Sequence, residues 1–456
     1  MLKRRQESNI DERSTVIGVL LFALPGIITY LFQMMYSAVD IVVVGRYCGE
    51  TAIAAVGSTS ALYNLVITFF MGFGAGVSAL VARHIGAQDD ERTHDAVHTS
   101  FAFAIACGIA LTLFGMIFGR NLLVAMSTPK NIIDHATLYL QIILAGSPGN
   151  LVYTFGTAIM RSNGDSKRPM YFLALSGIIH IILDLFFTVV LGMSVIGVAL
   201  ASTISQYISG LLAVGALLKM NSSCRLFIRD VRFHANELKS IIIIGFPAGL
   251  QYSIYGLSNV FIQSKINLFG SKAISGFSAA ASVSNFAIGA MEAFSDVTIV
   301  YVAHSYGARN FGKIRRLTNI CLIYAFSIGT LMGMAIAYFG KHFLGIYVRD
   351  NAEVISIGMK YLAVFKFTTG FSGGNEVTTS ALRGMEHPFA PTLTSIVGIC
   401  IFRAVWLETV FVKWHTLEMI FLSYPISFVI TGIVNVLSFY RVWSKERRKT
   451  CNEMLV

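Results

Sequence analysis

Residues 84–92 read HIGAQDDER and residues 305–313 read SYGARNFGK, and each run directly follows a long apolar stretch. Gly86 and Gly307 hold the same place in the two runs. The offset in numbering between these glycines recurs, to within one position, between Gly49 and Gly270, Pro25 and Pro247, Tyr139 and Tyr361, Arg161 and Arg383, and Pro169 and Pro391. One offset that holds over most of the chain indicates that the second half repeats the first.

Apolar segments dominate the 456 residues, of which 55% are hydrophobic and 13% are charged. An ordinary soluble domain has nearer 25% charged residues, and a membrane-spanning helix needs roughly 20 apolar residues. The composition therefore predicts an all-α integral membrane protein with about twelve transmembrane helices. We expect these helices near residues 16–38, 53–82, 95–118, 132–158, 169–191, 196–218, 241–267, 274–303, 317–340, 353–380, 390–411 and 417–440.

Six helices in each half place the start of both halves on the same side of the membrane. We expect two six-helix lobes related by a pseudo-twofold axis along the membrane normal, as in transporters built from parallel repeats. Two similar lobes that face each other enclose a central cavity, which favours a transporter over a channel or a receptor. The predicted parts are an N-terminal tail at 1–14, an N-lobe at 15–218, a linker at 219–240, a C-lobe at 241–441 and a C-terminal tail at 442–456.

Positive charge is distributed unequally between the two predicted sides. On the side of the N-terminus we count 24 Lys and Arg residues, against 8 on the opposite side, with Lys360, Lys366 and Arg403 inside helices. Cytoplasmic loops carry an excess of Lys and Arg, so both termini are predicted to be cytoplasmic and the protein to lie in the inner (cytoplasmic) membrane. The net charge of +11 then reflects topology, and we predict no nucleic-acid partner.

Signatures of enzymes and of metal centres are absent from the sequence. The six cysteines form no CxxC pair, which argues against a cysteine metal site or a disulfide. No HExxH, P-loop or nucleophile motif is present either. We therefore predict no enzyme activity, no metal site and no cofactor.

Four runs in the first half resemble the multidrug and toxic compound extrusion (MATE) family in its prokaryotic form. The resemblance extends over most of the chain, approximately residues 15–440, and recurs in the second half. It implies two six-helix lobes and export of drugs coupled to inward flow of H⁺ or Na⁺. The runs are LPGIITYLFQMMYSAVDIVVVGR at 24–46, GAGVSALVARHIGAQ at 74–88, AIMRSNGDSKRPM at 158–170 and IIHIILDLFFTVVLGMSVIGVALASTISQ at 178–206.

The major facilitators are the other large class with six plus six helices. They carry a loop of the type Gly-Asp-Arg-Gly-Arg between the second and third helices. Here residues 82–92 read ARHIGAQDDER, which does not match that pattern. We therefore set the major facilitator class aside.

Asp40 is the charged residue of the first predicted helix. An ionised carboxylate at mid-bilayer costs on the order of 2.5–3.5 kcal/mol, so it needs a partner, a proton or an ion. Pro25 lies earlier in this helix and removes a backbone donor, which predicts a hinge. The alternative is that Asp40 only caps or braces the helix. The polar face that it ends, at helical spacing, consists of Gln33, Tyr36, Ser37 and Asp40.

A second polar face lies in the fifth predicted helix, where Ser176, His180 and Asp184 are four residues apart. The proton-coupled members of the MATE family have aspartates where Asp40 and Asp184 fall and a tyrosine where Tyr139 falls. His180 departs from the Asn that relatives commonly have there. A histidine one turn from Asp184 can share its proton, or it can be a buried structural residue. The resemblance implies that Asp40, Asp184 and Tyr139 couple transport to a cation, and the position of His180 one turn from Asp184 adds it to the predicted coupling residues.

Three carboxylates lie in predicted helices of the second half: Glu292 and Asp296, one turn apart, and Glu376. They either recognise cations or form a structural charge network with Arg403, which we expect to be their ion-pair partner. Sodium-coupled members of the family carry acidic residues where this chain has Tyr255 and Ser372. These departures favour H⁺ over Na⁺.

Aromatic and methionine side chains accompany the charges, and they suit a site for organic cations because aromatic faces attract cations and methionine adapts its shape. Core packing or lipid contact is the alternative for each of them. We predict a monomeric, cation-coupled antiporter, with H⁺ favoured over Na⁺, that exports amphipathic organic cations by alternating access. The alternative is a flippase for a lipid-linked precursor, which would need a basic cavity. The predicted substrate-binding residues are Tyr36, Met35, Tyr255, Met291, Glu292, Asp296 and Glu376.

Overall fold

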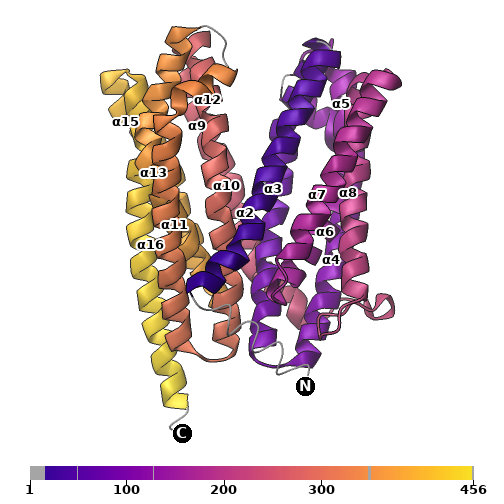
Figure 1. Ribbon diagram of the computed structural model, residues 1–456, viewed down its shortest axis with the longest axis vertical. Coiled ribbons are helices and arrows are strands. Elements are labelled where there is room, and N and C mark those ends of the chain that lie inside the picture. Colours follow the sequence, from indigo (N-terminus) through magenta and orange to yellow (C-terminus); the bar gives the residue numbers. More distant parts are fainter. Residues whose placement is uncertain (1–15, 49, 127, 348–350, 454–456) are drawn as a thin grey trace. The chain divides into compact units, whose positions relative to one another are not determined.

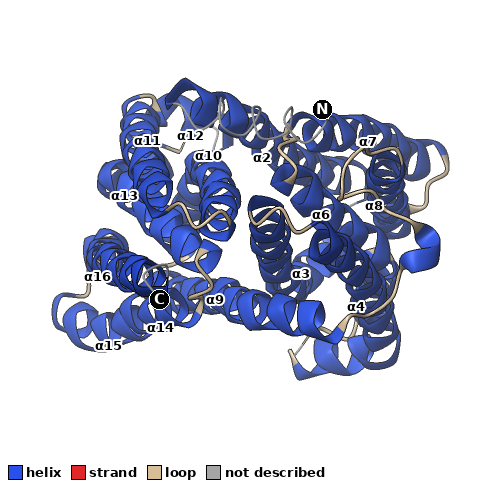
Figure 2. Cartoon of the chain, turned by 90° about the horizontal axis from the view of Figure 1, so that it is seen from below, coloured by secondary structure: helices blue, strands red, loops and turns tan. Residues whose placement is uncertain are grey.

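The structure is a computed structural model that describes residues 16–48, 50–126, 128–347 and 351–453. All regular secondary structure in these residues is helical (Figure 2). Eleven of the helices are long and apolar enough to cross a membrane. The prediction of an all-helical membrane protein is therefore confirmed, while the predicted tail at 1–14 lies outside the described residues.

Contacts divide the chain into two units whose boundaries fall inside helices. The first unit is Leu31–Gly249, and the second unit combines the residues up to Tyr30 with those from Leu250 onward. The predicted lobes end in loops, whereas these units end five residues after Pro25 and two residues after Pro247. The helices of each unit run side by side in alternating directions (Figure 1).

Six complete helices belong to the first unit, together with the second part of α2 (Val16–Val43) and the first part of α9 (Ala235–Asn267). This unit also contains two π-helical segments: η1 (Val44–Cys48) follows α2, and η2 (Phe186–Val190) follows α7. The short 3₁₀ turn η3 (Ile228–Asp230) lies in the linker. The six helices are α3 (Glu50–Gly86), α4 (Asp90–Ala125), α5 (Ile133–Ala145), α6 (Ser147–Ser162), α7 (Lys167–Leu185) and α8 (Ser194–Leu218).

The second unit has the remainder of α2 and α9 and the helices that follow. Helix α13 (Ala352–Gly384) is long enough to be a twelfth span, but Lys360, Lys366, Glu376 and Arg383 interrupt its apolar sequence. The predicted tail 442–456 is helical as far as Glu453. The other elements are α10 (Ser271–Gly307), α11 (Phe311–Tyr338), α12 (Gly340–Tyr347), α14 (Phe389–Ser395), η4 (Ile396–Ile401), α15 (Phe402–Trp414) and α16 (Leu417–Glu453).

Each of the twelve predicted spans corresponds to one long helical segment, if α5 with α6, and α14 with η4 and α15, are each counted as one span. Most of the helices extend beyond the predicted apolar core by a few residues because polar end turns continue the backbone hydrogen bonding. The break between α5 and α6 lies beside Pro148, whose ring nitrogen has no proton to donate.

The internal repeat extends to the backbone conformation of the turns. Gln88 and Arg309, which are equivalent positions of the two halves, both adopt positive φ angles, 58° and 54°. The next residue in each half, Asp89 or Asn310, accepts a hydrogen bond of 3.0 Å from the backbone N–H three residues on and caps the following helix. Gly164 and Glu386, and also Ser194 and His415, repeat a positive φ at the same offset, to within one position. The two halves thus share turn geometry as well as helix order.

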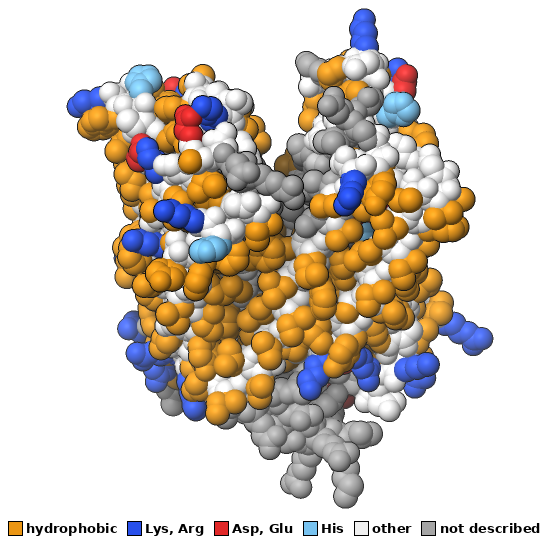
Figure 3. Space-filling view, turned by 45° about the horizontal axis from the view of Figure 1, so that its top comes forward, with side chains coloured by type: hydrophobic (Ala, Val, Ile, Leu, Met, Phe, Trp, Pro, Cys, Tyr) orange, Lys and Arg blue, Asp and Glu red, His pale blue; other side chains and the backbone are white. Residues whose placement is uncertain are grey.

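Hydrophobic side chains cover the flanks of the helices, and Lys and Arg side chains gather toward the helix ends (Figure 3). Many large apolar residues of α4, α7 and α11 are more than 40% exposed, including Ile117, Ile182 and Leu331. A soluble protein rarely exposes such continuous apolar surface. The exposed flanks are therefore the surface that contacts lipid.

Candidate functional site

Asp40 and His180 contact each other in the first unit, although they lie on helices that are distant in the sequence. Nε2 of His180 lies 3.5 Å from Oδ1 of Asp40 and 3.1 Å from the hydroxyl of Ser202 on α8. The His180 side chain is 7% exposed and that of Asp40 is 28% exposed. The imidazole therefore connects the carboxylate of α2 to a hydroxyl of α8.

Asp184 is completely buried, and none of the described residues donates a hydrogen bond to either of its oxygens. It lies close enough to Asp40 for the two carboxylates to interact electrostatically. The sequence spacing suggested that His180 would share a proton with Asp184, but the ion-pair contact of His180 is with Asp40. A buried ionised carboxylate without a donor is costly, and a proton or a bound cation at Asp184 would lower that cost.

Both carboxylates precede π-helical segments. Asp40 is four residues before η1, and Asp184 is two residues before η2. A π turn widens the helix and redirects the side chains next to it, and such turns are frequent at functional sites. The two π turns thus help to orient the carboxylates of Asp40 and Asp184 toward the interior of the first unit.

A cavity of about 360 Å³ opens beside these residues, entirely within the first unit. This volume lies within the range of roughly 300–1,000 Å³ that is usual for small-molecule sites. The lining is polar and aromatic, and none of the described lining residues is Lys or Arg. Its members are Gln33, Tyr36, Tyr63, Asn64, Ile67, Met71, Asn150, Tyr153, Thr154, Leu173, Ser176, Gly177, His180, Ser202, Ser205, Gln206 and Ser209.

Tyr36 is held in one orientation at the wall of this cavity. Its hydroxyl donates a 2.5 Å hydrogen bond to the carbonyl of Leu173, and its ring meets that of His180 edge-on at 6.3 Å. The ring lies directly against Gly177, where an added Cβ atom would be 1.7 Å from Cζ of Tyr36. Only glycine at position 177 leaves room for this tyrosine.

Tyr139 of α5 is 6% exposed and packs among apolar side chains. It lies within electrostatic range of Asp40, Asp184 and Tyr63. Tyr63 in turn accepts a 3.0 Å hydrogen bond from the Gln206 side chain. The four predicted coupling residues, Asp40, Asp184, His180 and Tyr139, therefore converge on one region, and their coupling role stays a prediction.

A separate buried polar cluster surrounds Tyr255 in the second unit. The Tyr255 hydroxyl lies 3.3 Å from Oε1 of Glu376 and 3.2 Å from the hydroxyl of Ser395, and it accepts hydrogen bonds from Gln251 (2.9 Å) and Asn375 (3.3 Å). The tyrosine thus occupies the position of the sodium-coupled family's glutamate without providing a carboxylate. The neighbouring Glu376 supplies the acid instead.

Arg383 is the arginine of this cluster, and the expectation of an ion pair with Arg403 is wrong. Arg383 is 0% exposed, donates to the Gln251 side chain at 2.8 Å, and interacts electrostatically with Glu292 and Glu376. Arg403 instead donates to Ser427 at 2.9 Å and has no acidic partner among the described residues. The repeat offset already paired Arg383 with Arg161, but charge counting assigned it to the membrane surface.

Arg403 is stabilised by aromatic rings rather than by acids. Its guanidinium carbon lies 4.4 Å from the ring centre of Tyr424 and 5.0 Å from that of Phe428. Such cation–π contacts are strongest where water is excluded. Arg403 nevertheless lies within electrostatic range of Tyr255, the tyrosine of the buried polar cluster.

The remaining predicted substrate residues occupy different surroundings. Met291 is 2% exposed and packs against Gly329 and Gly373, which is a core position, whereas Met35 is 53% exposed. Asp296 accepts a hydrogen bond of 3.4 Å from the hydroxyl of Tyr30, and Glu292 is half-buried. Of the predicted set, Tyr36 lines the cavity of the first unit.

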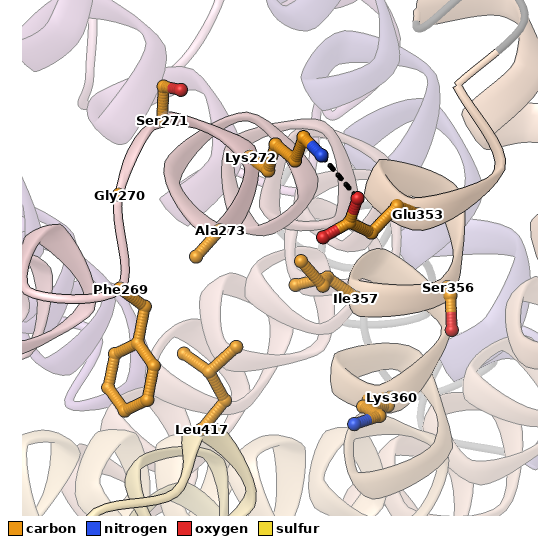
Figure 4. Close-up of a pocket in the computed structure, with 10 residues that line it drawn as sticks. All are labelled: Phe269, Gly270, Ser271, Lys272, Ala273, Glu353, Ser356, Ile357, Lys360 and Leu417. Atoms are coloured by element: carbon orange, nitrogen blue, oxygen red, sulfur yellow. Dashed lines mark hydrogen bonds and ion pairs between the residues drawn. The ribbon is translucent and has the colours of Figure 1, made fainter.

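A second pocket, of about 560 Å³, lies in the second unit, where the turn before α10 meets α13 and α16 (Figure 4). Its charged residues are paired: Lys272 with Glu353 across the pocket, and Lys360 with Glu418 at 2.8 Å. These exposed ion pairs contribute about 0–1 kcal/mol each. We assign this pocket no part in transport.

Comparison with known proteins places this geometry in a family. The family model MatE matches residues 25–186 and 247–406, two segments whose starts, Pro25 and Pro247, are equivalent positions of the repeat. The probable multidrug resistance protein YoeA of Bacillus subtilis is 26% identical over 442 residues, covering 94% of each chain. The probable multidrug resistance protein NorM of Thermotoga maritima is 22% identical over 392 residues, covering 83% of this chain and 82% of its own.

Solved structures show the same fold. A MOP superfamily transporter from Pyrococcus furiosus superimposes with a TM-score of 0.89 at 21% identity, covering 96% of this chain and 98% of its own. The repeated match extends over more than half of the chain and follows the internal repeat. The chain therefore belongs to the MATE family, whose members are membrane transporters and not enzymes.

Proposed function

We propose that this protein exports amphipathic organic cations in exchange for H⁺. The observation that carries the proposal is the contact of Asp40 with His180 beside the buried Asp184, at the edge of an aromatic cavity. Tyrosine rings attract organic cations, and carboxylates without a fixed basic partner can hold either a proton or such a cation. Competition between the two would provide antiport.

Two features support H⁺ over Na⁺ as the coupling ion. His180, a side chain that can carry a proton, contacts the predicted coupling carboxylate. The positions that are acidic in sodium-coupled relatives are Tyr255 and Ser372, and the Tyr255 hydroxyl is already engaged with Glu376 and Ser395. No cofactor beyond the coupling ion is proposed.

A flippase for a pyrophosphate-linked lipid receives no support from the first-unit cavity. Binding a pyrophosphate calls for Lys or Arg side chains, and none of the described lining residues is one. The named multidrug resistance proteins among the relatives also favour drug export. We propose a monomer acting on small molecules in the cytoplasmic membrane.

The coupling ion can be tested in proteoliposomes that contain the purified protein and the fluorescent cation ethidium. We expect a pH gradient at equal Na⁺ to drive uphill ethidium movement and a Na⁺ gradient at equal pH to drive none. Transport by the Na⁺ gradient alone would contradict the choice of H⁺ while leaving export intact. No movement with either gradient would contradict cation export itself.

Orientation is the second part of the proposal. The excess of Lys and Arg on one side supports cytoplasmic termini. A cysteine introduced beside Arg168 should react in intact cells only with reagents that cross the membrane, and one beside Lys130 should react with impermeant reagents. The opposite pattern would invert the topology.

Gly177 lies in the wall of the cavity, where its lack of a side chain leaves room for the Tyr36 ring. Gly177→Ala should displace the Tyr36 ring and break its hydrogen bond to Leu173, because the new methyl group would overlap the ring. We expect ethidium affinity to fall ~10-fold or more, equivalent to about 1.4 kcal/mol. Gly215→Ala on α8 is the matched control, since an added Cβ there meets open space. Equal affinity of the two variants would show that Tyr36 does not shape the site.

A further inference from the structure

A cluster of histidine and aspartate side chains lies at the start of α4, outside the transport cavity and within the first unit. His94 and His98 are one turn apart on α4, and Asp230 approaches them from η3 in the linker between the two repeats. Ligand atoms of these three residues all lie within 4.8 Å of one another. Among the described residues, this is the group whose chemistry and spacing suit a metal ion.

His94 is already placed as a ligand would be. Its Nε2 lies 3.4 Å from Oδ2 of Asp230, and its Nδ1 lies 3.7 Å from Oδ1 of Asp95. Two ligands of a tetrahedral Zn²⁺ are roughly 3.3 Å apart, given Zn–N and Zn–O distances of about 2.0–2.2 Å. Nε2 of His94 and the Asp230 carboxylate thus have the separation of a ligand pair, with Asp95 placed to orient the imidazole from behind.

His98 has a fixed tautomer with its lone pair turned toward the linker. Its Nδ1 lies 2.6 Å from the carbonyl oxygen of His94, so Nδ1 carries the proton and donates it there. Nε2 is therefore the acceptor, and it accepts the backbone N–H of Phe227 at 2.9 Å. A backbone carbonyl behind a ligating histidine is the usual arrangement at metal sites.

The Phe227 N–H is the group that a metal must replace. Phe227 stands three residues before Asp230 in the same linker segment. Its ring stacks on that of His98 at 6.3 Å and lies tilted to that of His94 at 6.0 Å. Metal binding therefore requires this segment to move, so that Nε2 of His98 is released from the Phe227 N–H and the ligand atoms, now within 4.8 Å of one another, come to ligand distance.

His234 is excluded from the ligand set although it is close by. Its Nδ1 is 3.2 Å from the hydroxyl of Thr99, and its Nε2 accepts a hydrogen bond from Arg232 at 2.9 Å. Both nitrogens are engaged, as those of His98 are, but the group bonded to Nε2 of His234 is the Arg232 guanidinium, whose positive charge opposes a metal ion there. Nε2 of His234 also lies 3.5 Å from Oδ1 of Asp95.

We propose that His94, His98 and Asp230 bind a divalent transition metal of the Zn²⁺ type, with water completing the coordination. Imidazole and carboxylate ligands suit this class of ion. The side chains of His94 and Asp230 are 33% and 50% exposed, which gives the ion a path from solvent, while His98 is buried. A bound ion would cross-link the linker to α4. The prediction of no metal site rested on the absence of CxxC and HExxH motifs, and Asp230 is distant in the sequence from both histidines.

The test uses the full chain, purified with a tag that lacks histidine and freed of metal with a chelator. Titration with Co²⁺ should give one saturable equivalent with visible absorption bands, displaced by Zn²⁺. His94→Gln and Asp230→Asn should each weaken the affinity by roughly 10-fold or more. His234→Gln, the matched control, should bind as the unmodified chain does. These variants leave the buried His98 in place, and we expect each of them to fold.

Protection of the linker gives a second readout that does not depend on transport. Zn²⁺ should slow trypsin cleavage at Arg225, Arg229 and Arg232 in the unmodified chain but not in Asp230→Asn. No saturable Co²⁺ or Zn²⁺ binding, or equal affinity in all three variants, would overturn the site. Binding without linker protection would overturn the participation of Asp230. Because neither readout involves the substrate, failure here is distinguishable from failure of the proposed export.

Discussion

Asp40→Asn should reduce uphill ethidium movement on a pH gradient to the level of empty liposomes, with the purified protein still folded. Asparagine keeps the shape of the protonated acid but cannot release a proton. The contact with Nε2 of His180, 3.5 Å away in the structure, would no longer join two groups that titrate. Because the buried Asp184 has no donor among the described residues, its replacement by Asn should also abolish coupling. Proteoliposome flux measures both variants.

The direction in which drug affinity changes with pH tests whether protons and drug compete. If protons and organic cations compete for Asp40 and Asp184, ethidium should bind more weakly to the unmodified protein as the pH falls. By reciprocity, bound ethidium must weaken proton binding by the same factor. Asp40→Asn should flatten this dependence, and His180→Asn should shift it without abolishing transport.

Asp134→Asn is the matched control, since Asp134 is a 77% exposed partner of Arg120 in the same unit. It should transport as the unmodified protein does. Uphill transport by Asp40→Asn at an undiminished rate would show that α2 does not carry the coupling. Glu292, Asp296 and Glu376 of the second unit would then become the coupling residues to test.

Arg383→Met should destabilise the second unit more than any other single change to an arginine. Arg383 is fully buried and donates to Gln251 and Tyr252, and its charge balances Glu376, whose Oε2 has no donor among the described residues. Removing one partner of a buried charge interaction costs about 3–5 kcal/mol because the other charge is left uncompensated. The loss is measured as a lower unfolding temperature in detergent.

A double-mutant cycle separates charge balance from packing. Glu376→Gln should recover part of the stability lost in Arg383→Met, because it removes the stranded charge. In Arg403→Met, which lacks an acidic partner, the same Glu376→Gln change should recover nothing. Additive effects in the Arg383 cycle would mean that the two side chains are not energetically coupled.

Much of the fold could be predicted from the sequence because its signals are local. The lengths of the apolar segments predict the membrane-spanning helices, and the constant offset between equivalent positions predicts the repeat. The repeat is also visible in the structure, in the positive φ angles of Gln88 and Arg309. The repeat does not carry these two carboxylates, however. At the offset that relates Pro25 to Pro247, Asp40 corresponds to Ile262 and Asp184 to Trp406. The two halves therefore share a scaffold and differ in chemistry.

The sequence alone determined the membrane-spanning helices, their duplication and the carboxylates that they carry, since each depends on residues near one another in the chain. The tertiary structure decided which of these side chains meet. It joined His180 to Asp40 instead of Asp184, gave the buried acids Arg383 instead of Arg403, and brought Asp230 to two histidines of α4. Helical spacing shows which face a residue occupies, but the facing partner depends on how helices distant in sequence pack together.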